Sequence, residues 1–435
     1  DELLGRPIYH QIADIPDPVD LALMLVPPQF VPQSLIDCGT RGIRAVIIAT
    51  GGFRETGADG AALERRCLEI AHDHQIRLIG PNCIGVANTH LPMDTTFLQP
   101  PPPPPGDMAF ISHSGAICAA VIDWIRGQGM GFSHLISLGN QADVNETDVL
   151  EPVAEDPHTR VLTMYLEGIS NGRRFMETAH RVTRQKPVIA LKVGRFEAGK
   201  RAAASHTGAL AGQEAAFDAA FHKTGVLRAN TSEEMFYWAR ALAWCPLPQG
   251  RRIAILTNAG GPGVTASDAL ELNHLKLADL SAATDAALKA ILPPAASTHN
   301  PVDMLASAPP EHYAQCLQTL LADDGVDGVI VISPPPPASS AGAVTKAILP
   351  IIQMSAKPVI LVLMGDQLIQ EGVAFARAAQ VVEYRFPEWA ASAMGALARY
   401  AEWRRLPEDH DWTFADINKD AAARLLEGQA AGEFL

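Results

Sequence analysis

Short apolar runs of strand length recur along this chain, and each is followed by a turn-forming residue and then by a helical pattern. The clearest runs are AVIIAT (45–50), RLIGPN (77–82), DMAFIS (107–112), VLTMYLE (161–167), PVIALKVG (187–194), RIAILTNAG (252–260), DGVIVIS (327–333) and KPVILVLMG (357–365). Uninterrupted apolar strands that alternate with amphipathic helices are typical of parallel sheets covered by helices on both faces. Ligands of such sheets bind at the carboxyl ends of the strands, so we expect functional residues in the turns after these runs.

Two breaks divide this pattern into three α/β units. The segment QPPPPPP (99–105) contains too many prolines for a helix or a strand and predicts a stiff connector, and CPLPQG (245–250) is a second break. We therefore predict units at 1–98, 106–244 and 250–404, followed by a tail at 405–435 that leads towards an absent domain. The first unit lacks an opening strand with a glycine-rich phosphate loop, and we expect this part to be missing from the chain.

The composition is that of a globular protein, and it excludes several classes of function. Hydrophobic residues make up 48% and charged residues 19% of the 435 positions, unlike the composition of disordered chains. The net charge of −14, without a run of Lys or Arg, argues against a partner that is nucleic acid or anionic lipid. No apolar run is long enough for a membrane span, and no signal peptide is visible. Six scattered cysteines without a C-x-x-C pair indicate a cytoplasmic protein with reduced thiols and without a metal site.

A strand-to-helix turn in the second unit carries the first candidate anion site. In ISHSGAICAAVIDWI the strand ends at Ser112, and Ser114 and Gly115 start a helix. Serine is a strong N-cap, and a glycine in the first turn allows a ligand to approach the backbone. The free amides and the dipole of the helix attract an anion there. We predict a phosphate site at Ser112, Ser114 and Gly115.

The third unit repeats this arrangement in LTNAGGPGVTASDAL. A proline is acceptable in the first turn of the helix. A single glycine-rich turn is weak evidence, but two of them in separate units support each other. The predicted phosphate-binding residues of this turn are Asn258, Gly260, Gly261 and Gly263. We expect the two turns to converge on one phosphate.

The segment AAASHTGALAG (202–212) places a histidine, His206, among small residues. One interpretation is an exposed histidine in a turn before a helix. The other is a phosphoryl carrier, which requires a neutral imidazole with one nitrogen held by a partner, usually a carboxylate. Glu167 ends a predicted strand and is the candidate carboxylate, although it could also be a solvated loop residue.

Several of these segments resemble the α subunit of succinyl-CoA synthetase and, more closely, the ADP-forming acetyl-CoA synthetases. Their order and spacing match this family from about residue 4 to residue 404. The segments that carry the resemblance are GPNCIG (80–85), SHSGA (112–116), YLEGI (165–169), ASHTGALAG (204–212), NAGGPG (258–263) and NPVD (300–303).

The resemblance implies a Rossmann-like CoA-binding domain followed by two flavodoxin-like, doubly wound parallel-sheet domains. It implies a reversible reaction in which acetate or a related acid, CoA and ATP give acyl-CoA, ADP and phosphate. An acyl phosphate forms, His206 takes the phosphoryl group, and Glu167 supports it. The small residues around His206 then allow its segment to move between two sites.

The resemblance also implies ligands and partners. ATP or ADP with Mg would be bound by an ATP-grasp domain or β subunit that is absent from this chain, and the protein is expected to be a homo-oligomer. The sequence does not identify the acyl group of the substrate, because one methylene changes the binding free energy by only about 1–3 kcal/mol. The residues that occupy the family's CoA-binding positions are Val26, Pro27, Thr50, Gly51, Asn82 and Cys83.

Two other functions are compatible with the same sequence. Some bacterial protein lysine acetyltransferases contain a synthetase-like region that senses acyl-CoA, and YRFPEWAASAMGALARYAEWRRL (384–406) resembles that group as well. A CoA-binding scaffold without chemistry is the third possibility. The intact SHTGALAG segment and Glu167 favour the ligase.

Overall fold

The computed structural model describes residues 2–196, 214–335 and 339–407, together with 418, 420, 421 and 424. The chain divides into two compact units, Asp1–Arg404 and Arg405–Leu435. The first unit contains the sheets and is described below. His206 lies outside the described residues. No helix in the described part of the chain is long and apolar enough to cross a membrane.

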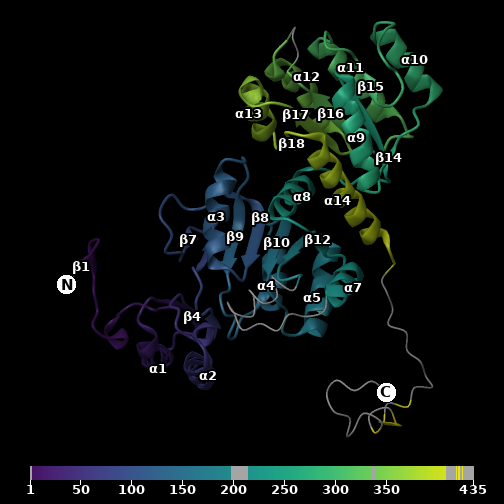
Figure 1. Cartoon of the computed structure of the whole chain (residues 1–435). Coiled ribbons are helices and arrows are strands. Elements are labelled where there is room, and N and C mark those ends of the chain that lie inside the picture. Colours follow the sequence, from purple (N-terminus) through teal and green to yellow (C-terminus); the bar gives the residue numbers. More distant parts are fainter. Residues whose placement is uncertain are drawn as a thin grey trace. The chain divides into compact units, whose positions relative to one another are not determined.

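The N-terminal region contains a small parallel sheet, drawn in purple in Figure 1. Its strands follow the order β3-β4-β5. The apolar strand β4 is largely buried, as its continuous AVII pattern predicts. Val46 and Ile48 share a hydrophobic cluster with residues of α1 and α2, whereas Ile47 belongs to a cluster with residues of the second sheet. Helix α1 ends at Gly42, whose φ of 88° is the left-handed conformation typical of a helix C-terminus. The elements are β1 (Glu2–Leu3), β2 (Arg6–Pro7), η1 (Ile12–Asp14), β3 (Leu21–Met24), η2 (Pro28–Phe30), α1 (Val31–Arg41), β4 (Ala45–Ile48), η3 (Arg54–Thr56), α2 (Ala58–Asp73) and β5 (Arg77–Ile79).

The second sheet has the order β12-β11-β10-β8-β9-β6-β7. Neighbouring strands from β8 to β12 are parallel, whereas β6 and β7 add an antiparallel edge. The register pairs Ser112 with Tyr165, and Leu166 with Lys192. The predicted functional turns after β8 and β10 therefore lie side by side at the carboxyl ends of these strands. The elements are β6 (Val86–Asn88), β7 (Met93–Asp94), β8 (Pro105–Ser112), α3 (Gly115–Arg126), β9 (Phe132–Ser137), α4 (Glu146–Glu155), β10 (Val161–Leu166), α5 (Gly172–Gln185), β11 (Val188–Lys192), α7 (Glu214–Thr224), β12 (Leu227–Ala229) and α8 (Ser232–Trp244).

Backbone hydrogen bonds join the first two sheets after β5. Asn140 N–H donates to Pro81 O at 2.8 Å, and Val144 N–H donates to Leu78 O at 3.1 Å. The next segment, Val86–Asn88, falls in the predicted first unit but pairs antiparallel with β9 in the second sheet. The chain therefore enters the second sheet before the proline-rich connector.

The third sheet is parallel throughout, in the order β14-β13-β16-β17-β18, with β15 also paired to β13. The Asn300 side chain of the NPVD segment takes part in it by accepting from Ile255 N–H and donating to Ile253 O, both at 2.9 Å. The elements are β13 (Arg252–Thr257), α9 (Gly260–Leu272), β14 (Lys276–Leu277), α10 (Ala282–Ile291), β15 (Val302–Asp303), α11 (Pro310–Ala322), β16 (Gly328–Ser333), α12 (Ala341–Met354), β17 (Val359–Leu363), η4 (Gln367–Ile369), α13 (Gln370–Ala378), β18 (Glu383–Tyr384) and α14 (Pro387–Arg405).

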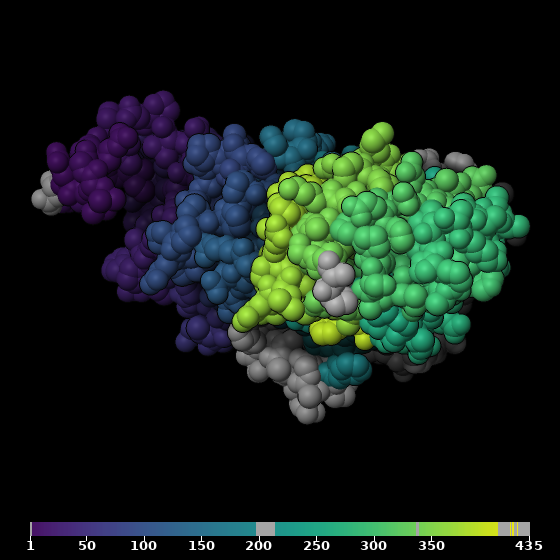
Figure 2. All heavy atoms as spheres, turned by 90° about the horizontal axis from the view of Figure 1, so that it is seen from above, coloured from purple at the N-terminus to yellow at the C-terminus, as the bar shows by residue number. Residues whose placement is uncertain are grey.

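The second and third sheets share one hydrophobic core. It contains Phe110 and Phe132 from the second sheet, Ile255 and Ile330 from the third, and residues of the helices α8 and α14. Trp238 of α8 donates its indole N–H to Ser392 Oγ of α14 at 2.9 Å. In Figure 2 the yellow-green residues near the end of this unit lie between the blue second sheet and the green third sheet. The predicted α/β architecture with parallel sheets is confirmed, apart from the antiparallel edge that β6 and β7 add to the second sheet.

Candidate functional site

The predicted CoA-binding residues lie in the loops that follow β3, β4 and β5. The Thr50 hydroxyl donates to Val26 O at 2.7 Å, and Asn82 N–H donates to Thr50 O at 2.9 Å. A Cβ on Gly51 would lie 3.3 Å from Asn82 Oδ1, so these two loops are in contact. The structure therefore brings the polar residues of three adjacent strand ends together.

Cys83 and Pro27 differ in accessibility, since Cys83 is buried and Pro27 is exposed. Cys83 is buried, and its thiol lies 3.5 Å from Ile48 O. Burial raises the pKa of this thiol to about 11, so it remains protonated at neutral pH. Pro27 precedes η2, and its carbonyl accepts from Phe30 N–H at 3.0 Å. Cys83 therefore offers a ligand only its backbone, and its side chain is part of the core.

A polar network that the sequence did not reveal fixes the loop after β4. The Asn140 amide donates to Glu55 Oε2 at 2.6 Å and to the buried Glu64 Oε2 at 2.9 Å. Burial opposes the ionisation of Glu55, but hydrogen bonds from Asn140 and from the Gly52 and Phe53 amides outweigh it and lower its pKa. This network ties the loop to the second sheet.

The predicted turn at Ser112–Gly115 forms as expected. Ser114 is the N-cap of α3, and its hydroxyl accepts from Ile117 N–H. The Ser112 hydroxyl accepts from Ser114 N–H at 3.1 Å and donates to Ser114 O at 2.9 Å. The structure adds a packing requirement at Gly115, because a Cβ there would lie 2.8 Å from Ile84 Cγ2, while its part in a phosphate site stays a prediction. This glycine allows close packing against the GPNCIG loop.

The second predicted turn has the same local geometry and is more open. Thr257 takes the place of Ser112, accepting from Ala259 N–H at 3.1 Å and donating to Ala259 O at 3.0 Å. Ala259 is the N-cap of α9 and supplies no side-chain cap, and a Cβ on Gly261 would meet no atom within 4 Å. The Asn258 side chain is buried, and its Oδ1 atom has no hydrogen-bond partner among the described residues.

The two remaining predicted glycines of this turn have close neighbours. A Cβ on Gly260 would lie 3.4 Å from Asp303 Oδ2, and a Cβ on Gly263 would lie 3.4 Å from the Pro301 side chain. Both neighbours belong to the NPVD segment. Among the described residues, no hydrogen bond joins this turn to the Ser112–Gly115 turn. The convergence of the two turns on one phosphate stays a prediction.

Glu167 follows directly after β10 and lies beside the first turn. Its backbone N–H donates to His113 Nδ1 at 3.1 Å, and His113 N–H donates to Tyr165 O at 3.1 Å. The other ring nitrogen of His113 lies 3.6 Å from Oε2 of the buried Glu146. The sequence analysis missed His113 and Glu146, because no spacing relates residues that meet only through the sheet. No group of three or more potential metal ligands is found in the part of the chain that the structure describes.

Three family models match the chain. They are a CoA binding domain at residues 1–89, a succinyl-CoA ligase-like flavodoxin domain at 105–242 and a ligase-CoA domain at 253–407. The chain is 42% identical, over 406 residues, to the α subunit of ADP-forming acetate–CoA ligase II from Pyrococcus furiosus. The match covers 92% of this chain and 88% of that subunit. The chain belongs to the ADP-forming acetyl-CoA synthetases.

Two further comparisons extend this assignment. The ADP-forming 4-hydroxybutyrate–CoA ligase of Nitrosopumilus maritimus is 34% identical over 98% of this synthetase chain, which spans 61% of that protein. Acetyl-coenzyme A synthetase 1 of Ca. Korarchaeum cryptofilum, solved in complex with phosphate and ADP, has a TM-score of 0.88 and 37% identity. That match covers 93% of this chain and 87% of the solved chain. The protein is thus an α-subunit-like chain of an ADP-forming acid–CoA ligase, and none of its three matched regions is an ATP-grasp region.

Proposed function

We propose that this chain binds CoA and carries a phosphoryl group on His206 within an ADP-forming acyl-CoA synthetase. The relatives act on acetate and on 4-hydroxybutyrate, so the proposed substrate is one of these or a related small acid. The observation that carries the proposal is the position of Glu167. In a chain of this family, the carboxylate that could hold a phosphohistidine stands at a strand end directly beside the Ser112–Gly115 turn.

The proposed reaction, in the direction of ATP formation, begins with inorganic phosphate. A phosphate oxygen attacks the thioester carbonyl, CoA leaves as its thiol, and an acyl phosphate remains. A neutral ring nitrogen of His206 then attacks phosphorus, and the free carboxylate leaves. Glu167 accepts a hydrogen bond from the other ring nitrogen and stabilises the positive ring. The phosphoryl group finally passes to ADP, which the ATP-grasp partner binds together with Mg.

The residues of the first domain fit a CoA-binding role. Three adjacent strand ends place the Thr50 hydroxyl, the Asn82 amide and the Gly51 backbone in one loop cluster. Ligands of parallel α/β sheets bind at this edge. The helix starts of α3 and α9 supply free amides for the phosphate, and Asn258 adds a buried side chain beside the second start.

The test is phosphorylation of the enzyme assembled from this chain and its ATP-grasp partner. With labelled ATP and Mg, we expect a label on this chain that is stable in base and lost in acid. The His206→Ala variant should carry none, whereas His299→Ala, which changes an exposed histidine of the third unit, should be labelled like the wild type. Equal labelling of His206→Ala would contradict the proposed carrier.

A further inference from the structure

The backbone of Glu167 is held by a side chain from the neighbouring strand end. His113 follows β8, and its backbone N–H donates to Tyr165 O while its Nδ1 atom accepts from Glu167 N–H, both at 3.1 Å. The Glu167 carboxylate is partly exposed and has no hydrogen bond from any described residue. The carbonyl of the same peptide, Leu166 O, accepts from Val193 N–H at 3.0 Å, so the His113 ring and the next strand together set where this carboxylate begins.

The hydrogen bond to Glu167 also fixes which tautomer of His113 is present. Because Nδ1 accepts, the proton of the neutral ring is on Nε2. That atom points towards Glu146 Oε2 at 3.6 Å, and the two side chains are only 2% and 1% exposed. Neither atom has a hydrogen-bond partner in the described part of the chain.

Glu146 is the first residue of α4, where the helix dipole favours a negative group, and its Oε1 atom accepts from the Thr147 hydroxyl at 3.1 Å. A shift of about 0.7 Å would bring Nε2 and Oε2 within normal hydrogen-bonding distance. Two facing buried atoms without partners favour such a shift, because unsatisfied polar groups are costly in the interior.

We propose that His113 and Glu146 form a positioning pair for Glu167. This inference rests on the proposed function of Glu167 and adds the two residues that position its carboxylate. Glu146 orients the His113 ring through Nε2–H, and the ring holds the Glu167 backbone through Nδ1. The pair does not touch the reacting phosphoryl group. It keeps the carboxylate at the distance that a phosphohistidine requires, since catalytic geometry tolerates only small displacements.

The first experiment uses this chain alone and measures hydrogen exchange at the Glu167 amide. His113→Leu removes the acceptor, so the amide should exchange at least about 10-fold faster than in the wild type. His113→Asn offers an oxygen near the Nδ1 position and should restore most of the protection. His134→Asn, on β9 of the same sheet, is the matched control and should leave this amide unchanged. Equal exchange in His113→Leu and wild type would overturn the inference.

The second experiment measures single-turnover phosphorylation of the assembled enzyme. We expect His113→Leu and Glu146→Leu to lower the rate about 10- to 100-fold, with the KM for CoA unchanged. Glu146→Gln keeps an acceptor for Nε2–H and should recover most of the rate. If Glu146→Leu phosphorylates at the wild-type rate, Glu146 has no positioning role and the proposed pair is wrong.

The two experiments separate this inference from the proposed function. If the wild-type enzyme carries no acid-labile label, the phosphoryl-carrier function fails, while the exchange rates still decide whether His113 holds Glu167. If the wild type is labelled and the His113→Leu and Glu146→Leu variants match it, the positioning pair alone fails. Should the leucine variants not fold, Glu146→Gln decides through the ¹⁵N signal of the His113 ring. The pair predicts that this signal changes when the carboxylate facing Nε2–H becomes an amide, and an unchanged signal overturns the pair.

Discussion

At the scale of single residues, the proposed chemistry depends on one carboxylate. Glu167 directly follows a buried strand. Two hydrogen bonds hold this strand end to the next one, one donated by the His113 backbone N–H and one accepted by the His113 ring. Its position could be predicted from the sequence, because a charged residue after an apolar strand must lie at the ligand-binding edge. Its partners could not, since Glu146 and His113 are separated in sequence and meet only after the sheet and α4 have formed.

We predict that Glu167→Gln preserves the fold and slows phosphorylation of the assembled enzyme by about 100-fold or more. The amide keeps the size of the side chain but loses the charge that stabilises a positive imidazole ring. Rapid-quench measurement of the label gives the rate. Glu177→Gln, on the exposed surface of α5, is the control and should react like the wild type. A Glu167→Gln rate equal to that of the wild type would remove this residue from the mechanism.

At the scale of elements, the strand-to-helix turns follow their sequence patterns closely. Ser112 and Thr257 make the same pair of hydrogen bonds, one residue type replacing the other. The close packing at Gly115 could not be predicted, because Ile84 lies in the loop between β5 and β6, far from Gly115 in the sequence. The antiparallel pairing of Val86–Asn88 could not be predicted either, because three residues are too few to show a strand pattern.

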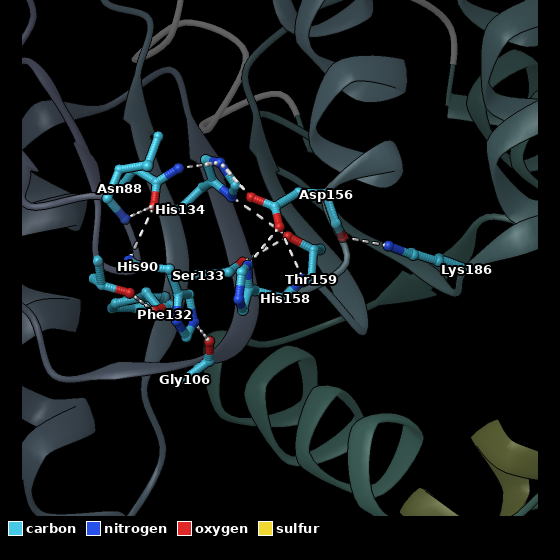
Figure 3. Close-up of polar contacts among 12 residues, drawn as sticks. Asn88, His90, Gly106, Phe132, Ser133, His134, Asp156, His158, Thr159 and Lys186 are labelled. Atoms are coloured by element: carbon cyan, nitrogen blue, oxygen red, sulfur yellow. Dashed lines mark hydrogen bonds and ion pairs between the residues drawn. The ribbon is translucent and has the colours of Figure 1, made fainter.

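Strand β9 carries a histidine, His134, whose surroundings oppose its protonation (Figure 3). His134 accepts from the Asn88 amide at 3.0 Å, because the amide oxygen of Asn88 is already taken by the His90 and Leu91 N–H groups. Its ring also lies 3.3 Å from Asp156 Oδ2. Burial lowers the pKa of His134, and the nearby His90, His158 and Lys186 add to this effect, while Asp156 opposes it.

We predict that this histidine makes stability depend on pH below about 6.5, the usual pKa of an unfolded histidine. Since the folded state binds the proton less readily, the free energy of unfolding should fall as the pH drops from about 7 to 5. His134→Asn should reduce the slope. Urea unfolding at several pH values measures it. The lowered pKa of Asp156 acts below about 3.8, outside this range. An equal slope in variant and wild type would refute the assignment.

At the scale of the whole described unit, the second and third sheets are joined by a buried charge cluster as well as by their common core. Glu383 of β18 is 2% exposed and contacts Arg240 of α8, Arg377 of α13 and Arg385. Arg240 is equally buried, and its guanidinium also lies over the Tyr384 ring. The sequence predicted the α/β class of these regions. It could not predict that α8 and α14 pack in one core with both sheets, because a helical pattern does not identify the surface that the helix will contact.

We predict that Glu383→Gln lowers the free energy of unfolding by about 3–5 kcal/mol, because it leaves the buried Arg240 without its carboxylate. Chemical unfolding of this chain measures the change. The exposed ion pair of Arg173 and Glu177 provides the comparison, and Glu177→Gln should cost about 0.5 kcal/mol or less. A Glu383 variant as stable as the Glu177 variant would show that the cluster does not hold the sheets together.

The shared core of α8 and α14 has a consequence for how such chains can evolve. The proline-containing break at 245–250 is a boundary in the sequence, yet the surfaces on its two sides are complementary halves of one interior. Recombination between relatives at this point would combine helix faces that were never selected together. The third domain can therefore be exchanged successfully only along with α8, or after the α8 face has been adapted to its new partner.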